Sequence, residues 1–243
     1  GRGELQLAVL IESMRREGFE LQVSRPEVII REIDGTPNEP VERAVVDVPD
    51  EYVGVITQTA APRKGKVTDL RPGDTGRTIV TVEAPARGLL GFRSLLMTAT
   101  RGTALVHQHH AGWMPWAGEL PHRTGGAMVA DRKGAATGFA LDNLQKRGEL
   151  FIGPGTDVYE GMVIGEASRG ENMVVNPTKG KQLTNIRTHS SDEAIKLKPH
   201  KEHTLETAIE WIAADELVEV TPEAVRIRKR LLKESDRKRA KQR

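Results

Sequence analysis

Residues 77–99 read RTIVTVEAPARGLLGFRSLLMTA and contain the two periodicities that decide the fold. Val80, Val82 and Ala84 alternate with other residues, a pattern typical of a strand with one buried face. Beyond Gly88 the apolar positions recur every three or four residues, which predicts a helix whose buried stripe is Leu89, Phe92, Leu96 and Ala99. The stretch therefore predicts a strand that leads directly into a helix.

The flanking residues extend this unit on both sides. A strand is predicted over residues 41–48, a helix capped by Asp50 follows it, and further strands are predicted over 66–70 and 103–109. Together these segments give the order βαββαβ, the split βαβ arrangement of a ferredoxin-like domain. We place this domain at residues 40–112.

The N-terminal residues predict a helix over 4–17 and a strand over 19–23. The apolar residues of this helix fall at i, i+3, i+4 and i+7, so we expect one buried face made of Leu7, Leu10, Ile11 and Met14. A lone helix and strand cannot close a core, and the sequence begins without Met. We therefore expect residues 1–39 to be the end of a truncated ferredoxin-like domain and a linker, within a piece of a longer protein.

The C-terminal part, residues 113–243, has a different pattern. Short strands are predicted over 127–131, 149–152 and 162–168, with glycine-rich turns between them, which indicates antiparallel β structure. Residues 172–199 are polar, lack apolar periodicity and predict a long, basic, protruding loop. A helix after Thr204 and a hairpin joining 217–220 to 224–227 complete a chain that is α+β overall.

Charge is distributed unevenly along the sequence. Residues 222–243 hold ten Lys and Arg against three acidic residues, although the formal net charge of the chain is only +2. Because Val225 and Ile227 alternate with basic residues, one strand face is predicted to carry Arg226, Arg228 and Arg230. Such a face suits phosphate contacts with folded RNA, and the alternatives are a solvated charged face and a frayed basic tail.

Several other chemistries lack their sequence patterns. The chain has no Cys, no Gly-x-x-x-x-Gly-Lys-Ser/Thr phosphate loop, and no Ser-His-Asp arrangement with local support. No apolar run approaches the roughly 20 residues that span a bilayer, so we expect no membrane role. The strand alternation places His107 and His109 on one face, where they could share a metal ion with His110 or His122. Since no carboxylate lies nearby in the sequence, we expect an ordinary strand face and no metal site.

Several motifs resemble one family of proteins. GRGELQL at 1–7 and MRREGF at 14–19 resemble the end of the third domain of elongation-factor-G-like GTPases, and PARGLLGFR at 85–93 with TRG at 100–102 resembles the fifth domain of the BipA (TypA) branch. VNPTKGKQLTNIR at 175–187, ELVEVTP at 216–222 and IRKR at 227–230 resemble the domain peculiar to that branch. Together these motifs cover nearly the whole chain.

The resemblance implies a cytoplasmic factor that binds the ribosome near the A site and acts in ribosome assembly or stress adaptation. GTP and Mg²⁺ would belong to a G domain outside this chain, so we expect neither a cofactor nor catalysis here, and we expect a monomer. The implied partners are rRNA of the large subunit and the acceptor end of an A-site tRNA. The loop residues suited to phosphate, sugar or base contacts are Lys179, Lys181, Gln182, Thr184, Asn185 and Arg187. A metal-dependent enzyme using His107 and His109, and a protein-interaction scaffold, remain the alternatives.

Overall fold

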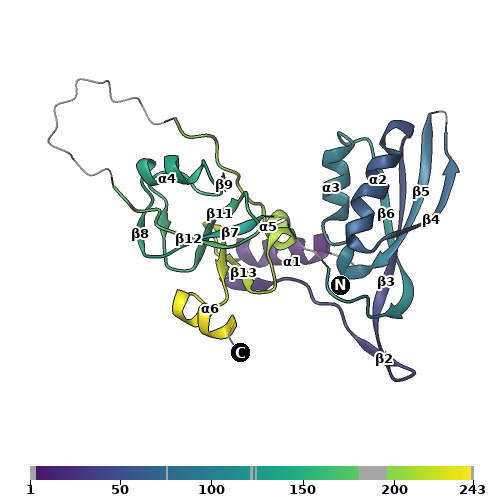
Figure 1. Ribbon diagram of the computed structural model, residues 1–243, viewed down its shortest axis with the longest axis horizontal. Helices are drawn as coiled ribbons and strands as arrows, with labels where there is room; N and C mark the ends of the chain where they lie inside the picture. The colour runs from purple at the N-terminus through teal and green to yellow at the C-terminus, as the bar shows by residue number, and fades with distance from the viewer. Residues whose placement is uncertain (1–3, 75, 121–122, 124, 181–195, 242–243) are drawn as a thin grey trace. The chain divides into compact units, whose positions relative to one another are not determined.

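The computed structural model describes residues 4–74, 76–120, 123, 125–180 and 196–241 (Figure 1). The chain forms two compact units: residues 26–122 are one, and residues 1–25 together with 123–243 are the other. Within the described residues, no helix has the length and apolar character needed to cross a membrane.

The unit of residues 26–122 contains one five-stranded sheet whose strand pairs are all antiparallel. Across the sheet the order is β6–β3–β5–β4, and β2 pairs with the beginning of β3. Its elements in chain order are β2 (Arg31–Ile33), β3 (Thr36–Pro49), η1 (Asp50–Tyr52), α2 (Val53–Ala60), η2 (Ala61–Arg63), β4 (Lys66–Pro72), β5 (Arg77–Pro85), η3 (Ala86–Gly88), α3 (Phe92–Ala99) and β6 (Leu105–Pro115).

The core of this unit lies between the sheet and two helices. The alternating residues of β3 and β5 point to one face, which α2 and α3 cover (Figure 1). Ile56 of α2 and Phe92 and Leu96 of α3 are fully buried against that face. The periodicities of residues 77–99 are therefore confirmed, except that Ala99, at the end of the predicted stripe, is exposed.

Asp50 does not have the predicted capping role. No side chain caps α2 or the 3₁₀ turn before it, and Asp50 begins that turn instead. Its Oδ1 accepts a hydrogen bond from Thr78 Oγ1 on β5, 2.7 Å away. The carboxylate therefore connects the end of β3 to the neighbouring strand, a contact between distant residues that local spacing cannot reveal.

A buried ion pair connects β3 to the turn before α3. Glu39 is fully buried, and Arg87 Nη2 donates to its Oε1 at 3.0 Å. Burial by itself would raise the pKa of Glu39, but the hydrogen bonds from Arg87 and the Ala117 N–H, together with the charges of Arg87 and Lys64, outweigh it and the pKa is lowered. Arg87 also donates to the Gly118 carbonyl, and its guanidinium lies 3.8 Å above the centre of the Trp116 ring. The pair thus holds the segment after β6 against the sheet.

The second unit contains a seven-stranded sheet with the order β1–β13–β14–β11–β7–β12, in which β9 also pairs with β11. All these pairs are antiparallel except β12 with β7. Its elements are α1 (Glu4–Arg16), β1 (Leu21–Ser24), β7 (Gly126–Ala130), β8 (Gly134–Ala135), α4 (Gly138–Leu144), β9 (Gly148–Leu150), β10 (Asp157–Val158), β11 (Met162–Ala167), β12 (Met173–Val175), α5 (Leu205–Trp211), β13 (Glu216–Val220), β14 (Val225–Lys229) and α6 (Glu234–Lys241).

The N-terminal helix buries only part of the predicted face, because Ile11 is buried and Met14 is half-buried. Ala8 and Ile11 of α1 pack into a core formed with α5 and the strands, whereas Leu10 is 56% exposed and Leu7 is 37% exposed. The strand that follows, β1, pairs with β13 through Leu21–Val220 and the next three positions. Residues 1–25 therefore join the C-terminal unit, while residues 26–39 belong to the other unit. Their interpretation as the end of a truncated ferredoxin-like domain stays a prediction.

The predicted loop over 172–199 begins as a strand. Residues 173–175 form β12, which runs parallel to β7, and Asn172 Oδ1 accepts a hydrogen bond from Ala127 N at 2.8 Å. This strand is only three residues long and has polar residues on both sides, so it is too short to give a periodic apolar pattern in the sequence. Both units combine helices with mostly antiparallel sheets, so the predicted α+β class is confirmed.

We predict that Arg87→Ala lowers the free energy of unfolding by about 3–5 kcal/mol, because it leaves the Glu39 carboxylate buried without its partner. Urea unfolding followed by circular dichroism measures the change. Arg93→Ala is the matched control: Arg93 is exposed on α3, and its loss should change stability by no more than about 0.5 kcal/mol. Equal stability of the two variants would mean that the pair contributes little.

Candidate RNA-binding surface

Strand β14 divides its residues between two faces. Ile227 is buried in the core at 4% exposure, whereas Arg226 and Arg228 lie half-buried on the other face. Arg230 is exposed and follows the last residue of the strand, and its backbone N–H donates to the Asp215 carbonyl at 2.8 Å. The structure therefore places two of the three predicted arginines on one strand face and the third directly beyond it.

The environments of these arginines differ. Arg228 Nη1 donates to the Lys229 carbonyl at 3.3 Å, and its buried Nε has no hydrogen-bond partner among the described residues. On the neighbouring strand, Glu219 is in register with Arg226 and accepts a hydrogen bond of 2.6 Å from Tyr159 Oη. Burial and this hydrogen bond raise the pKa of Tyr159. The strand face that carries these arginines is thus positive, but it also carries the acidic side chain of Glu219.

The described start of the predicted loop is held by backbone and turn contacts. Thr137 Oγ1 donates to the Lys179 carbonyl at 2.6 Å, while Asn176 Oδ1 accepts from Thr178 N at 3.0 Å. The Lys179 side chain is exposed. The backbone is therefore fixed next to a side chain that is available to a partner. The remaining predicted loop residues lie outside the described residues, namely Lys181, Gln182, Thr184, Asn185 and Arg187.

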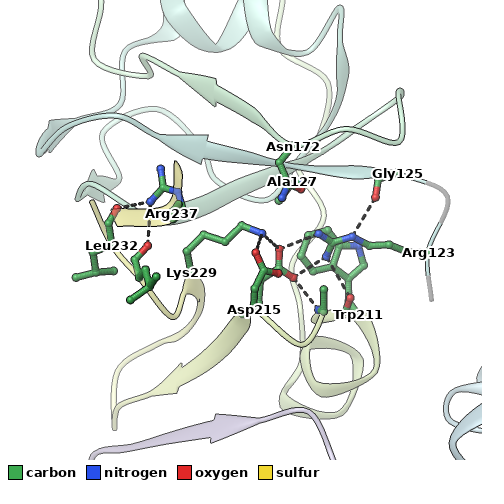
Figure 2. Close-up of polar contacts among 12 residues, drawn as sticks. Arg123, Gly125, Ala127, Asn172, Trp211, Asp215, Lys229, Leu232 and Arg237 are labelled. Atoms are coloured by element: carbon green, nitrogen blue, oxygen red, sulfur yellow. Dashed lines mark hydrogen bonds and ion pairs between the residues drawn. The ribbon is translucent and has the colours of Figure 1, made fainter. Parts of the chain in front are cut away.

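A polar network that includes Arg123, Asp215 and Lys229 surrounds a buried carboxylate (Figure 2). Both oxygens of Glu216 accept hydrogen bonds of 2.7 Å from the guanidinium of Arg123, and Oε1 also accepts from Lys229 Nζ at 2.7 Å. The Ala213 N–H donates to Oε2 at 2.8 Å. Burial would raise the pKa of Glu216, but Arg123 and Lys229 outweigh it and the pKa is lowered. The carboxylate is therefore ionised and fully paired.

Lys229 belongs to the basic run of the sequence, but in the structure it forms a buried ion pair. Sequence reasoning grouped it with the basic run of residues 227–230, yet its side chain is only 1% exposed and pairs with Glu216 and with Asp215, the latter at 2.8 Å. One signal could have found it. Val225, Ile227 and Lys229 share the inward face of β14 by alternation, so the position requires a buried partner for the cation.

An aromatic group adjoins this network. The Arg123 guanidinium lies 3.8 Å above the centre of the Trp211 ring, and Trp211 Nε1 donates to Glu166 Oε2 at 2.8 Å. Phe151 meets Trp211 edge-on at 5.1 Å and meets His203 edge-on at 4.4 Å between ring centres. Burial lowers the pKa of His203 to about 4, and nearby Lys201 acts in the same direction. His203 is therefore neutral at pH 7.

The histidines of β6 belong to the unit of residues 26–122 and lie on its surface. His107 and His109 are both exposed, opposite Val45 and Arg43 of β3. Glu42 is in register with His110, a carboxylate neighbour that the sequence spacing did not reveal. Burial raises the pKa of Glu42, and the charges of His109 and His110 oppose that rise. Among the residues that the structure describes, no three His, Cys, Asp or Glu side chains are grouped as metal ligands. His122 lies outside them.

Comparison with known proteins matches both units to described families. Residues 125–234 match the TypA/BipA C-terminal domain, and residues 37–124 match the elongation factor G C-terminus. A relative from Escherichia coli K12, named large ribosomal subunit assembly factor BipA, is 50% identical over 99% of this chain and 40% of its own length. The chain belongs to the BipA family.

Other relatives with the same name show similar identity. Those from Haemophilus influenzae Rd and Synechocystis sp. PCC 6803 are 48% and 47% identical, over 99% and 94% of this chain and 39% and 38% of their own lengths. The chain thus spans about two fifths of the length of these relatives. The family resemblance drawn from the motifs is confirmed.

We predict that acidification destabilises this BipA-family chain partly through His203. The pKa of His203 is about 4 when folded and 6.5 as an ordinary value, so between these values the unfolded chain binds more protons. The free energy of unfolding is therefore fully retained above pH 6.5 and falls as the pH drops toward 4. Thermal unfolding at intervals from pH 7 to 4.5 should show a smaller loss in His203→Phe than in the parent chain.

His107→Phe is the control for this series, because His107 is exposed on β6. Its melting temperature should fall with pH in parallel with that of the parent chain. If His203→Phe also runs parallel to the parent, burial of this imidazole does not contribute to acid sensitivity.

Proposed function

We propose that this chain is the ribosome-binding C-terminal part of a BipA-type translational GTPase, and that it contacts rRNA of the large subunit and the acceptor end of an A-site tRNA. The observation that carries the proposal is the match to relatives named large ribosomal subunit assembly factor BipA along nearly the entire chain. The proposal places GTP, Mg²⁺ and hydrolysis in a separate G domain of the longer protein. It also places that protein in the cytoplasm as a monomer that acts in ribosome assembly or stress adaptation.

The element order supports a ferredoxin-like assignment for residues 40–112. Strands and helices follow one another as βαββαβ, and the sheet order β6–β3–β5–β4 places the first strand beside the third and the last. Such a sheet reads single-stranded RNA when aromatic side chains line its central strands. Since β5 has no aromatic residue, we assign RNA contacts to phosphate recognition by the other unit.

The arginines at the end of the chain support electrostatic recognition. Arg226 and Arg230 have no carboxylate partner within ion-pair distance among the described residues, and Arg230 is exposed. Lys179 adds a third available cation from the base of the loop. Lys and Arg that neutralise phosphates release counterions, so affinity should fall steeply with salt.

We predict that Arg226→Gln with Arg230→Gln weakens ribosome binding and lowers the slope of log affinity against log salt by about two, one unit for each cation removed. Cosedimentation with 70S particles and separated 50S subunits over a salt series measures both effects. Lys146→Gln with Arg147→Gln removes the same charge from exposed positions near α4 and is the matched control. An unchanged slope in the first pair would assign those arginines to a solvated surface.

We predict that Lys179→Ala with Lys181→Ala reduces ribosome affinity without lowering the melting temperature. The contact that anchors this segment uses the Lys179 carbonyl, which the substitution retains. Cosedimentation and thermal unfolding test this in the present chain, and complementation tests it in the full-length protein. Lys133→Ala, an exposed lysine of the same unit, is the control. A double variant that melts several degrees lower, or binds as tightly as the parent, contradicts the assigned role.

A further inference from the structure

Strand β13 places one carboxylate directly beside the arginine face of β14. Glu219 is in register with Arg226 on one side and with Gln22 of β1 on the other, so Arg226 is the cation next to it in the sheet. Residues opposite each other in antiparallel strands have Cβ atoms about 4.5–5.5 Å apart, and opposite charges there attract each other. Among the described residues, however, no cation lies within ion-pair distance of Glu219. Another contact therefore holds this carboxylate.

That contact comes from Tyr159, whose hydroxyl donates a hydrogen bond of 2.6 Å to Glu219 Oε2. A hydrogen bond to an ionised carboxylate is about twice as strong as one between neutral groups. Burial and the bond to Glu219 raise the pKa of Tyr159, so the hydroxyl keeps its proton at neutral pH and remains a donor. The charges of Arg228 and Arg226 oppose that rise, which places both guanidinium groups near the hydroxyl.

The turn that carries Tyr159 fixes the position of its hydroxyl. The Met162 N–H donates to the Tyr159 carbonyl at 3.1 Å, and Gly161 has a φ of +89° at the third position, which fits a type II turn. Gly161 also connects the turn to the ends of two strands, because its N–H donates to the Ala130 carbonyl at 2.9 Å and its carbonyl accepts from the Lys229 N–H at 2.8 Å. The tyrosine ring packs against the core that contains Met162. The hydroxyl is therefore placed by its own surroundings, and Glu219 adjusts to it.

The hydrogen bond matters because carboxylate and phosphate compete for the same guanidinium group. Arginine binds either anion through two parallel N–H groups, so an Arg226 that is paired with Glu219 has fewer donors left for RNA. The tyrosine hydroxyl occupies one carboxylate oxygen and brings no charge of its own to the face. It thereby removes a competitor for Arg226 without adding another cation.

We propose that Tyr159 is a positioning residue for RNA binding, because its hydroxyl holds Glu219 away from Arg226 and leaves that arginine available to phosphate. This inference rests on the proposed RNA-binding function and deepens it with a residue that acts through another side chain. Two other roles predict different results: the hydrogen bond only satisfies a half-buried hydroxyl, or Tyr159 contacts RNA itself.

The first test is Tyr159→Phe, which retains the ring in the core and removes only the hydroxyl. Titration of the fluorescently labelled chain with 50S subunits measures the affinity. The variant should bind about two- to five-fold more weakly, which is the effect of one competing cross-strand ion pair. Tyr52→Phe changes the chain's other tyrosine, which lies in the unit of residues 26–122, and should bind like the parent chain. Equal affinity of Tyr159→Phe and the parent would overturn the proposal.

Glu219→Gln separates positioning from the other roles, because a neutral amide cannot form an ion pair with Arg226. In the Glu219→Gln background, adding Tyr159→Phe should cause no further loss of affinity, and the same should hold in the Arg226→Gln background. A loss that persists in the Glu219→Gln background would overturn the proposal. Thermal unfolding then identifies the true role: a lower melting temperature means structural support, and an unchanged one means direct contact with RNA.

A crystal structure of Tyr159→Phe gives a readout that does not depend on RNA. Arg226 should lie within ion-pair distance of Glu219 in that variant, and separate side chains there would overturn the proposal. If Arg226→Gln weakens binding to 50S subunits and Tyr159→Phe does not, the positioning role is wrong and the proposed function stands. If the parent chain does not bind 50S subunits, the proposed function is wrong and the positioning role falls with it.

Discussion

The buried carboxylate of Glu216 is the constraint on which the C-terminal unit depends. Removing a carboxylate from water is costly unless cations and N–H groups surround it, and Glu216 meets this condition with Arg123, Lys229 and the Ala213 amide. These partners come from the segment that enters the unit, from β14 and from the end of α5. The ion network therefore joins Arg123, which is 93 residues from Glu216 in the sequence, to the neighbouring α5, β13 and β14, and it is satisfied only when all of them are in place.

This network also determines which way the arginines point. Because Lys229 pairs with Glu216 across β13 and β14, the register of the two strands is fixed, and a shift of one residue would expose Ile227 and bury Arg226 or Arg228. The inward alternation of Val225, Ile227 and Lys229 thus leaves the other face to the arginines. The candidate binding surface is a consequence of how the unit is held together.

The sequence predicted what local periodicity controls and missed what distant contacts control. The strand and helix of residues 77–99 were predictable because each repeats its own apolar spacing over several turns or alternations. On α1 the same spacing was right for Ile11 and wrong for Leu7 and Leu10, since Ala8 lies beside Ile11 on the face that meets the core formed by α5. The pairing of β12 with β7, the Glu42–His110 register and the cluster around His203 depend on residues brought together only by the fold.

The basic composition of the C-terminus overstates the positive charge that a partner can use. Lys229 is committed to a buried pair, Arg237 donates to the Leu231 carbonyl at 3.0 Å, and Lys238 lies 2.6 Å from Glu234 within α6. That helix also begins with a hydrogen bond from the Glu234 N–H to Glu160 Oε1 at 3.1 Å, so the described part of the tail is ordered against the unit and is not a frayed extension. A charge count treats all these cations alike, but a phosphate can attract only those that the fold leaves uncommitted. Arg226 and Arg230 therefore matter more than the net charge, because contacts to phosphate can be made only by the cations that the fold leaves available.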